Sequence, residues 1–146
     1  IALIYQIIVD GMQNKRFFFD QKKASDAIEW IEEHAYHCEG PLAPGNVSLE
    51  LWQKALVSCI FGITDKDGNR QFREVFLVVG RKNGKSLFAS AIAKYIWLKE
   101  GGYGARVYCL APKFDQADII YNAICILNVV NRFRIIFFSL KINIIT

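Results

Sequence analysis

Apolar residues recur every three to four positions in two N-terminal stretches, which is the spacing of an amphipathic helix. Residues 22–37 and residues 48–62 both have this spacing. We expect the first helix to begin after Asp20 and the second after Ser48, because Asp and Ser side chains accept hydrogen bonds from the free N–H groups at a helix start. Residues 41–46 are rich in Pro and Gly and predict a loop between the two helices.

The following stretch alternates between apolar runs and helical patterns. Residues 75–79 (VFLVV) predict a strand buried on both faces, residues 87–100 a helix, and residues 105–112 a second buried strand. A further helix is expected at residues 113–124. This order of strand, loop, helix, strand and helix is typical of an α/β fold with parallel strands. The Asp-Gly pair at residues 67–68 predicts a hairpin-type turn.

The composition fits one folded domain of ordinary size. The chain has 146 residues, of which 53% are hydrophobic and 22% charged. Its formal net charge is +4, but residues 125–146 contain three of the 18 basic residues and none of the 14 acidic ones. The remainder has 15 basic and 14 acidic residues, so its charge gives no argument for nucleic-acid binding.

Several features concern the compartment of the protein. No apolar run reaches the roughly 20 residues that a membrane helix needs. The N-terminus has neither the basic region nor the small-residue cleavage site of a signal peptide. The chain does not begin with Met, so we expect that it starts inside a longer reading frame or was trimmed. The four cysteines form no CxxC pair and are expected to be reduced thiols, which favours a cytoplasmic location.

The strongest chemical signal is Gly84-Lys85-Ser86, which follows a predicted strand and begins a predicted helix. Backbone N–H groups at such a junction bind phosphate, a lysine there reaches the β- and γ-phosphates, and a serine hydroxyl binds Mg²⁺. The full motif GxxxxGK[ST] places a glycine where this chain has Val79, and Gly80 follows one position later. The alternative is that these residues form only a turn that caps a helix.

Several segments together resemble one protein family. The loop VGRKNGKS, with the helix and the strand that follow it, is similar to the ATPase segment of bacteriophage terminase large subunits, the motors that package viral DNA. The upstream blocks FFFDQKKASDAIEWIEEH, LELWQKALVSCIFG and FREVFLVV match in the same order. The resemblance covers about residues 17–124. It implies part of a P-loop ATPase fold of the additional-strand type, with an N-terminal helical segment.

The resemblance implies that Arg81 and Lys85 are the catalytic residues of the loop. Family members have a deviant Walker A loop, so the missing glycine is expected. Arg81 matches an arginine that acts on the γ-phosphate as an arginine finger does; the alternative is an ordinary salt bridge. The other expected nucleotide-binding residues of the loop are Gly80, Lys82, Asn83, Gly84 and Ser86. For Lys82 the alternative is a solvated side chain.

Gln53 matches the glutamine of the adenine-recognition motif that precedes Walker A in this family. A carboxamide offers both a donor and an acceptor, which suits the edge of adenine. The alternative is that Gln53 lies on the polar face of an amphipathic helix. Its neighbour Trp52 is expected to pack in the core.

The resemblance also implies cofactors and partners. These are ATP and Mg²⁺, viral double-stranded DNA, the portal and the small terminase subunit, in an oligomeric motor of the bacterial cytoplasm without a membrane role. ATP hydrolysis further needs a Walker B Asp and an adjacent Glu, which in the family come well after residue 124, before a separate nuclease domain. The last acidic residue of this sequence is Asp118, so the 146 residues contain neither group.

The chain divides by its sequence into four segments. They are an N-terminal flank (1–16), a helical segment with the adenine-recognition block (17–62), a phosphate-loop βαβα unit (63–124) and a tail (125–146). The tail is rich in Ile, Asn and Phe, contains no acid and does not resemble the family. AT-rich codons encode these residue types, so we hypothesise that a frameshift near codon 125 replaced the native sequence. The alternative is a genuine apolar strand or helix.

These observations predict a fragment of a terminase ATPase domain that binds Mg·ATP weakly and does not turn it over. Two alternatives are a prophage remnant without activity and another P-loop nucleic-acid motor, such as a helicase.

Two further signals favour ordinary surface roles. The pair His34 and His37 suggests a metal site but fits the polar face of a helix better. Scattered lysines such as Lys22, Lys23 and Lys113 are expected to be solvated rather than bound to DNA.

Overall fold

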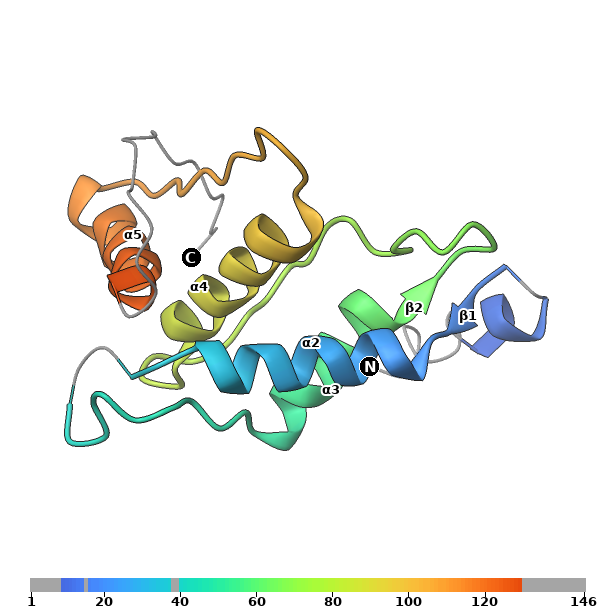
Figure 1. Ribbon diagram of the computed structural model, residues 1–146, viewed down its shortest axis with the longest axis horizontal. Helices are drawn as coiled ribbons and strands as arrows, with labels where there is room; N and C mark the ends of the chain where they lie inside the picture. Colours follow the sequence, from blue (N-terminus) through green and yellow to red (C-terminus); the bar gives the residue numbers. More distant parts are fainter. Residues whose placement is uncertain (1–8, 15, 38–39, 130–146) are drawn as a thin grey trace. The chain divides into compact units, whose positions relative to one another are not determined.

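The chain, shown as a computed structural model in Figure 1, is described for residues 9–14, 16–37 and 40–129. Its elements are β1 (Phe18–Phe19), α2 (Gln21–His34), α3 (Leu51–Gly62), β2 (Ile63–Thr64), α4 (Lys85–Tyr95), the π-helix η1 (Ile96–Glu100) and α5 (Phe114–Val129). Two compact units are present, the first made of residues 1–29 and 49–77 and the second of residues 30–48 and 78–146. None of the described helices has the length and apolar character that crossing a membrane requires.

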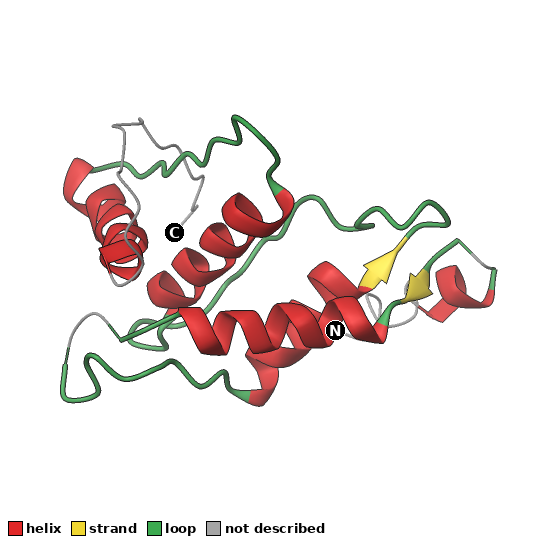
Figure 2. Cartoon of the chain, viewed as in Figure 1, coloured by secondary structure: helices red, strands yellow, loops and turns green. Residues whose placement is uncertain are grey.

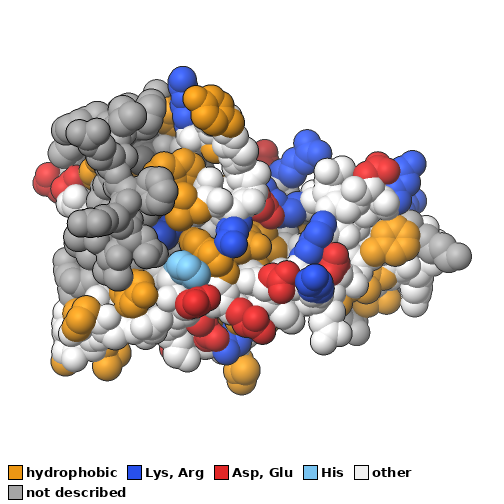
Figure 3. All heavy atoms as spheres, viewed as in Figure 1, with side chains coloured by type: hydrophobic (Ala, Val, Ile, Leu, Met, Phe, Trp, Pro, Cys, Tyr) orange, Lys and Arg blue, Asp and Glu red, His pale blue; other side chains and the backbone are white. Residues whose placement is uncertain are grey.

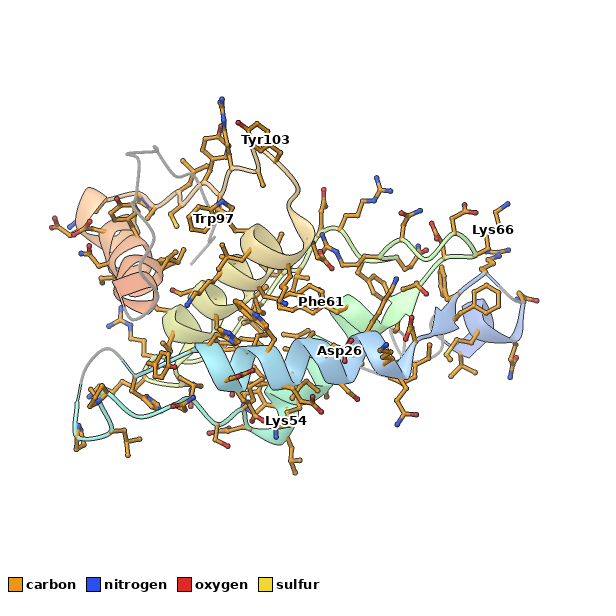
Figure 4. The ribbon with its side chains drawn as sticks, viewed as in Figure 1. Asp26, Lys54, Phe61, Lys66, Trp97 and Tyr103 are labelled. Carbon is orange, nitrogen blue, oxygen red and sulfur yellow. The ribbon has the colours of Figure 1, made fainter. Side chains whose placement is uncertain are left out.

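A small apolar core holds the first unit together. Its buried side chains come from the start of α2 and from α3 and β2, and they are Ala24, Ala27, Val57, Ile60, Phe61 and Ile63. Phe61 is labelled in Figure 4. Gly62 ends α3 in close contact with this core, because a Cβ there would lie 2.8 Å from the ring of Phe19 and 2.9 Å from the Cβ of Ala24. Only glycine allows the backbone to approach this closely.

The start of α2 is as predicted, whereas the start of α3 is not. The backbone N–H of Lys23 donates to Asp20 Oδ1 at 3.0 Å, so Asp20 caps α2. Helix α3 begins at Leu51, and its N-cap is Glu50 instead of Ser48. Glu50 is the cap because two hydrogen bonds form between it and Gln53. Its side chain accepts one from the N–H of Gln53, and its own N–H donates the other to the side chain of Gln53, so two backbone N–H groups are satisfied.

The first unit also contains the sheet, and the turn predicted at residues 67–68 follows it. Strands β1 and β2 pair antiparallel, with Phe18 opposite Thr64 and Phe19 opposite Ile63 (Figure 2). After β2 the chain turns at Asp65–Asn69 and returns to form an isolated bridge between Thr64 and Arg70. Gly68 has a φ of +79°, a left-handed conformation that glycine adopts without strain. The predicted hairpin-type turn is therefore confirmed.

The carboxylate of Asp65 organises this turn. Asp65 Oδ1 accepts hydrogen bonds from the N–H groups of Asp67 and Asn69, both at 2.9 Å. The bond from the Asn69 backbone is the main cause that lowers the pKa of Asp65 below its ordinary value of 3.8. A carboxyl group with a lowered pKa stabilises the folded state at pH values above its unfolded pKa, and this contribution is lost as the pH falls through the folded pKa.

We therefore expect the Asp65 contribution to stability to be fully present above about pH 4 and to disappear in more acidic solution. Replacing Asp65 with asparagine keeps an acceptor oxygen but removes the titration, so the unfolding temperature of D65N should fall less between pH 6 and pH 3 than that of the wild type. The matched control is D67N, in the same turn, which should keep the wild-type dependence on acid. Equal acid dependence in D65N and the wild type would contradict the role of Asp65.

The second unit is built on α4 and α5, which pack against each other. Their core consists of Ala93, Cys109, Ile120 and Ile124, with Trp97, Val107 and Ala117 packed around it. Helix α4 and η1 together end at Glu100, before Gly101-Gly102, so the helix predicted at residues 87–100 is confirmed, although its last five residues form a π-helix. Helix α5 starts at Phe114, one residue after the start of the predicted helix at residues 113–124, and continues beyond it to Val129.

A buried lysine joins α4 to the end of α2 within this unit. Lys94 is 3% exposed, and its Nζ donates to the carbonyl O of His34, the last residue of α2, at 3.1 Å. Its ammonium also lies 5.9 Å from the centroid of the Trp30 ring, on which the His34 ring stacks at 4.4 Å. A cation at this position interacts favourably with the free carbonyls of a helix C-terminus.

The described residues contain no group of three or more His, Cys, Asp or Glu that could hold a metal ion.

The two predicted parallel strands, residues 75–79 and 105–112, do not form in the described part of the chain. The sheet described there has two antiparallel strands, and residues 75–79 belong to a loop in Figure 2. Phe76 is 73% and Val78 77% exposed, and residues 74–79 make no hydrogen bond within the described chain. A strand that is apolar on both faces becomes stable only when neighbouring strands pair with its edges and other layers cover it. No described segment pairs with residues 75–79 or 105–112, although Val107 and Cys109 of the second segment pack against α4 and α5, so parallel pairing is not shown in the described part of the chain.

Candidate phosphate-binding site

The candidate loop, Gly80–Gly84, follows residues 74–79, which belong to no helix or strand, and leads into α4. All five of its residues are exposed. Two of them, Lys82 and Gly84, have a φ of +65° in the left-handed region. The side chain of Asn83 folds back over the loop, and its Nδ2 donates to the carbonyl O of Gly80 at 3.3 Å and to that of Arg81 at 3.4 Å. The local turn is therefore closed by an asparagine amide, while its backbone N–H groups stay available.

Gly84 is the N-cap of α4. Its carbonyl O accepts the first helical hydrogen bond, from the N–H of Phe88 at 2.9 Å. A Cβ on Gly84 would meet no atom within 4 Å, so the requirement for glycine is the left-handed backbone and not lack of space. The N–H groups of Lys85, Ser86 and Leu87 have no hydrogen-bond partner among the described residues. These donors and the positive end of the helix dipole fit a phosphate group.

Three cations, Arg81, Lys82 and Lys85, flank these donors. Arg81 and Lys82 are exposed on the loop, while Lys85 and the neighbouring Ser86, the first two residues of α4, are half-buried. None of the three cations forms an ion pair in the described part of the chain, so the alternative of an ordinary salt bridge for Arg81 finds no partner there. Positive charge is thus left uncompensated around free N–H groups, which is the electrostatic requirement for binding a polyphosphate.

Gln53 lies in the first unit, and its side chain is partly engaged within α3. Gln53 is 8% exposed, and its Oε1 accepts a hydrogen bond from the N–H of Glu50 at 2.9 Å. The alternative that Gln53 lies on the polar face of an amphipathic helix does not describe it fully, because Gln53 is buried and forms part of the helix cap. The pattern Glu-x-x-Gln at residues 50–53 signals this cap in the sequence. Trp52 is not a core residue, since it is exposed and its Nε1 donates to Glu50 Oε2 at 2.7 Å.

A buried hydroxyl lies below the loop, at a position that the sequence reasoning did not single out. Ser90 is one helical turn after Ser86 and is 0% exposed. Its Oγ donates to the carbonyl O of Ser86 at 2.7 Å. The only sequence signal was a serine four residues after the serine of GKS, on an otherwise apolar helix face.

Positive and negative side chains are mixed on the face shown in the space-filling view. On the face shown in Figure 3, Lys and Arg side chains alternate with Asp and Glu instead of gathering in one area. Lys66, labelled in Figure 4, lies at the exposed tip of the turn after β2. This distribution is that of solvated surface charges.

Comparison with known proteins identifies a family. Residues 51–143 match the family model for the ATPase domain of the terminase large subunit. The match covers more than half of the chain and includes the candidate loop with α3, α4 and α5. The resemblance described above covers about residues 17–124, whereas this match continues to residue 143 and so includes most of the tail, residues 125–146. The divergence of the tail from the family therefore stays a prediction. Neither a curated protein nor a solved structure matches the chain.

Proposed function

Because the chain belongs to the family of terminase large subunit ATPase domains, we propose that it is the ATP-binding part of a motor that packages viral DNA. The observation that carries this proposal is the start of α4. There the N–H groups of Lys85, Ser86 and Leu87 are free within the described chain, next to cations that have no ion-pair partner in it. A nucleotide polyphosphate supplies the acceptors and the negative charge that this arrangement lacks.

Each residue of the loop has a proposed role. Lys85 neutralises the β- and γ-phosphates, and the Ser86 hydroxyl is a ligand of the Mg²⁺ that accompanies ATP. Arg81 reaches the γ-phosphate from the exposed side of the loop as an arginine finger in cis. The remaining residues, Gly80, Lys82, Asn83 and Gly84, line the phosphates through their backbone N–H groups.

In the proposed contact with adenine, Gln53 offers fewer hydrogen-bonding groups than a carboxamide without other partners would offer. Since Oε1 already accepts the N–H of Glu50 with one of its two lone pairs, the carboxamide is partly engaged, whereas its Nε2 donor makes no hydrogen bond among the described residues. This donor would bind an acceptor nitrogen of adenine. We therefore assign Gln53 a contribution to base binding and not the whole discrimination among bases.

The wider function follows from the family and is likewise proposed. The partners would be viral double-stranded DNA, the portal and the small terminase subunit, in an oligomeric motor in the cytoplasm of the bacterial host. These 146 residues contain no acidic residue after Asp118, and so no Walker B Asp and no catalytic Glu. For these residues on their own we propose binding of Mg·ATP without turnover.

The test is thermal unfolding of the wild-type chain with increasing Mg·ATP. A ligand that binds only the folded state stabilises it by about 2.7 kcal/mol at 100 times its Kd, so the unfolding temperature should rise steadily with concentration. MgCl₂ alone is the control and should produce no such rise. A cooperative transition that Mg·ATP leaves unchanged would contradict the proposal. Absence of any cooperative transition would favour the alternative of a prophage remnant without activity.

A further inference from the structure

The completely buried Ser90 connects the candidate phosphate site to α5. Its hydroxyl is 2.7 Å from the carbonyl O of Ser86, and the carbonyl O of Ile120 in α5 lies 3.4 Å from the same hydroxyl. A serine hydroxyl has a single hydrogen to donate. The short contact to Ser86 is therefore the main bond, and the contact to Ile120 is a weaker second branch.

The surroundings of Ser90 explain why this hydroxyl reaches a second helix. The interface between α4 and α5 is otherwise built from apolar side chains, among them Ala93, Ile120 and Ile124. Small side chains at Ser90 and Ala93 allow the two backbones to come close, so that a side chain on α4 lies within hydrogen-bond range of a carbonyl on α5. The position of α5 is thus linked to Ser86 through one polar atom.

We propose that Ser90 is a positioning residue for the Mg²⁺-dependent part of nucleotide binding. The inference rests on the proposed function, in which the Ser86 hydroxyl is a ligand of the ATP-bound Mg²⁺. Ser90 does not touch the nucleotide. By holding the carbonyl of Ser86, it fixes the first turn of α4 against α5 and thereby the direction in which the Ser86 hydroxyl points.

A serine hydroxyl often bonds to the carbonyl four residues earlier for purely structural reasons. The two roles differ in one measurable quantity, the ratio of the affinities for ATP with Mg²⁺ and with EDTA. Loss of a positioning bond lowers this ratio, because only the metal-dependent contact loses its geometry. Loss of a merely structural bond lowers the unfolding temperature and leaves the ratio unchanged.

The experiment is titration of the wild type, S90A and S90T with a fluorescent ATP analogue, once with Mg²⁺ and once with EDTA. S90A should bind the Mg²⁺ complex about two- to tenfold more weakly, the range of one hydrogen bond, while its affinity in EDTA stays within about twofold of the wild type. S90T keeps a hydroxyl that can bond to the same carbonyl and should recover most of the ratio.

The matched control is A93G, which lies on the same helix and faces the same core. A glycine there destabilises the helix by roughly 1 kcal/mol without removing the Ser90 bond, so the affinity ratio should equal that of the wild type. Equal loss of the ratio in A93G and S90A, or an unchanged ratio in S90A, would overturn the positioning role. If the wild type itself gains no affinity from Mg²⁺ and does not bind the analogue, the proposed function fails and this role falls with it.

Discussion

Replacing Lys85 with alanine is expected to abolish detectable binding of a fluorescent ATP analogue. Lys85 is the first residue of α4, next to the free N–H groups of Ser86 and Leu87. A hydrogen bond to a charged group contributes about 1.5–3 kcal/mol, so its loss lowers affinity roughly 10- to 150-fold. Since the wild-type chain is proposed to bind weakly, this loss moves binding out of the measurable range. The measurement is fluorescence anisotropy at fixed Mg²⁺.

The matched control for this result is K99A. Lys99 is an exposed lysine of η1 in the same unit, so the change in charge and in side-chain length is identical. Its affinity should stay within about twofold of the wild type, because screened charges far from the site contribute little. Circular dichroism should show both variants folded. Wild-type affinity in K85A would refute the assignment of the phosphate loop.

Local signals in the sequence predicted local structure well. Asp20 caps α2, the turn at residues 67–68 forms, and α4 begins within the GKS triplet, because each feature depends on residues only a few positions apart. The helices fill the predicted ranges to within a few residues. The same reasoning placed Gly84, Lys85 and Ser86 at the start of a helix, where they lie, and their role in phosphate binding remains a proposal.

Features that depend on distant partners were predicted less well. The run VFLVV at residues 75–79 indicates a buried strand only if other strands and layers cover it, and no described segment does so. A cap was expected at Ser48, whereas Glu50 is the cap, because the reciprocal bond with Gln53 depends on a pair of residues and not on one favourable residue. The role of Ser90 was not predicted either, because its burial depends on contact with α5, a distant part of the sequence.

A substitution in the core beneath the site should have the largest effect on stability. Phe88 is 2% exposed, one turn into α4, and its N–H makes the first helical hydrogen bond, to Gly84. Replacing a buried phenylalanine with alanine removes its apolar contacts and leaves a cavity, at a loss of about 3–5 kcal/mol. Since domains are stable by only about 5–15 kcal/mol in total, F88A should be largely or partly unfolded at 37 °C.

Urea denaturation followed by circular dichroism measures this loss. Leu98 provides the comparison, because it is an exposed apolar residue of η1 in the same unit, and L98A should change the free energy of unfolding by less than about 0.5 kcal/mol. F88A should also bind Mg·ATP more weakly, since the free N–H groups converge only while the first turn of α4 is formed. Saturating Mg·ATP should recover part of the lost stability, because ligand binding pulls the population towards the folded state. A denaturation midpoint equal to that of the wild type would mean that Phe88 does not anchor the helix. The phosphate site would then draw its rigidity from the loop alone.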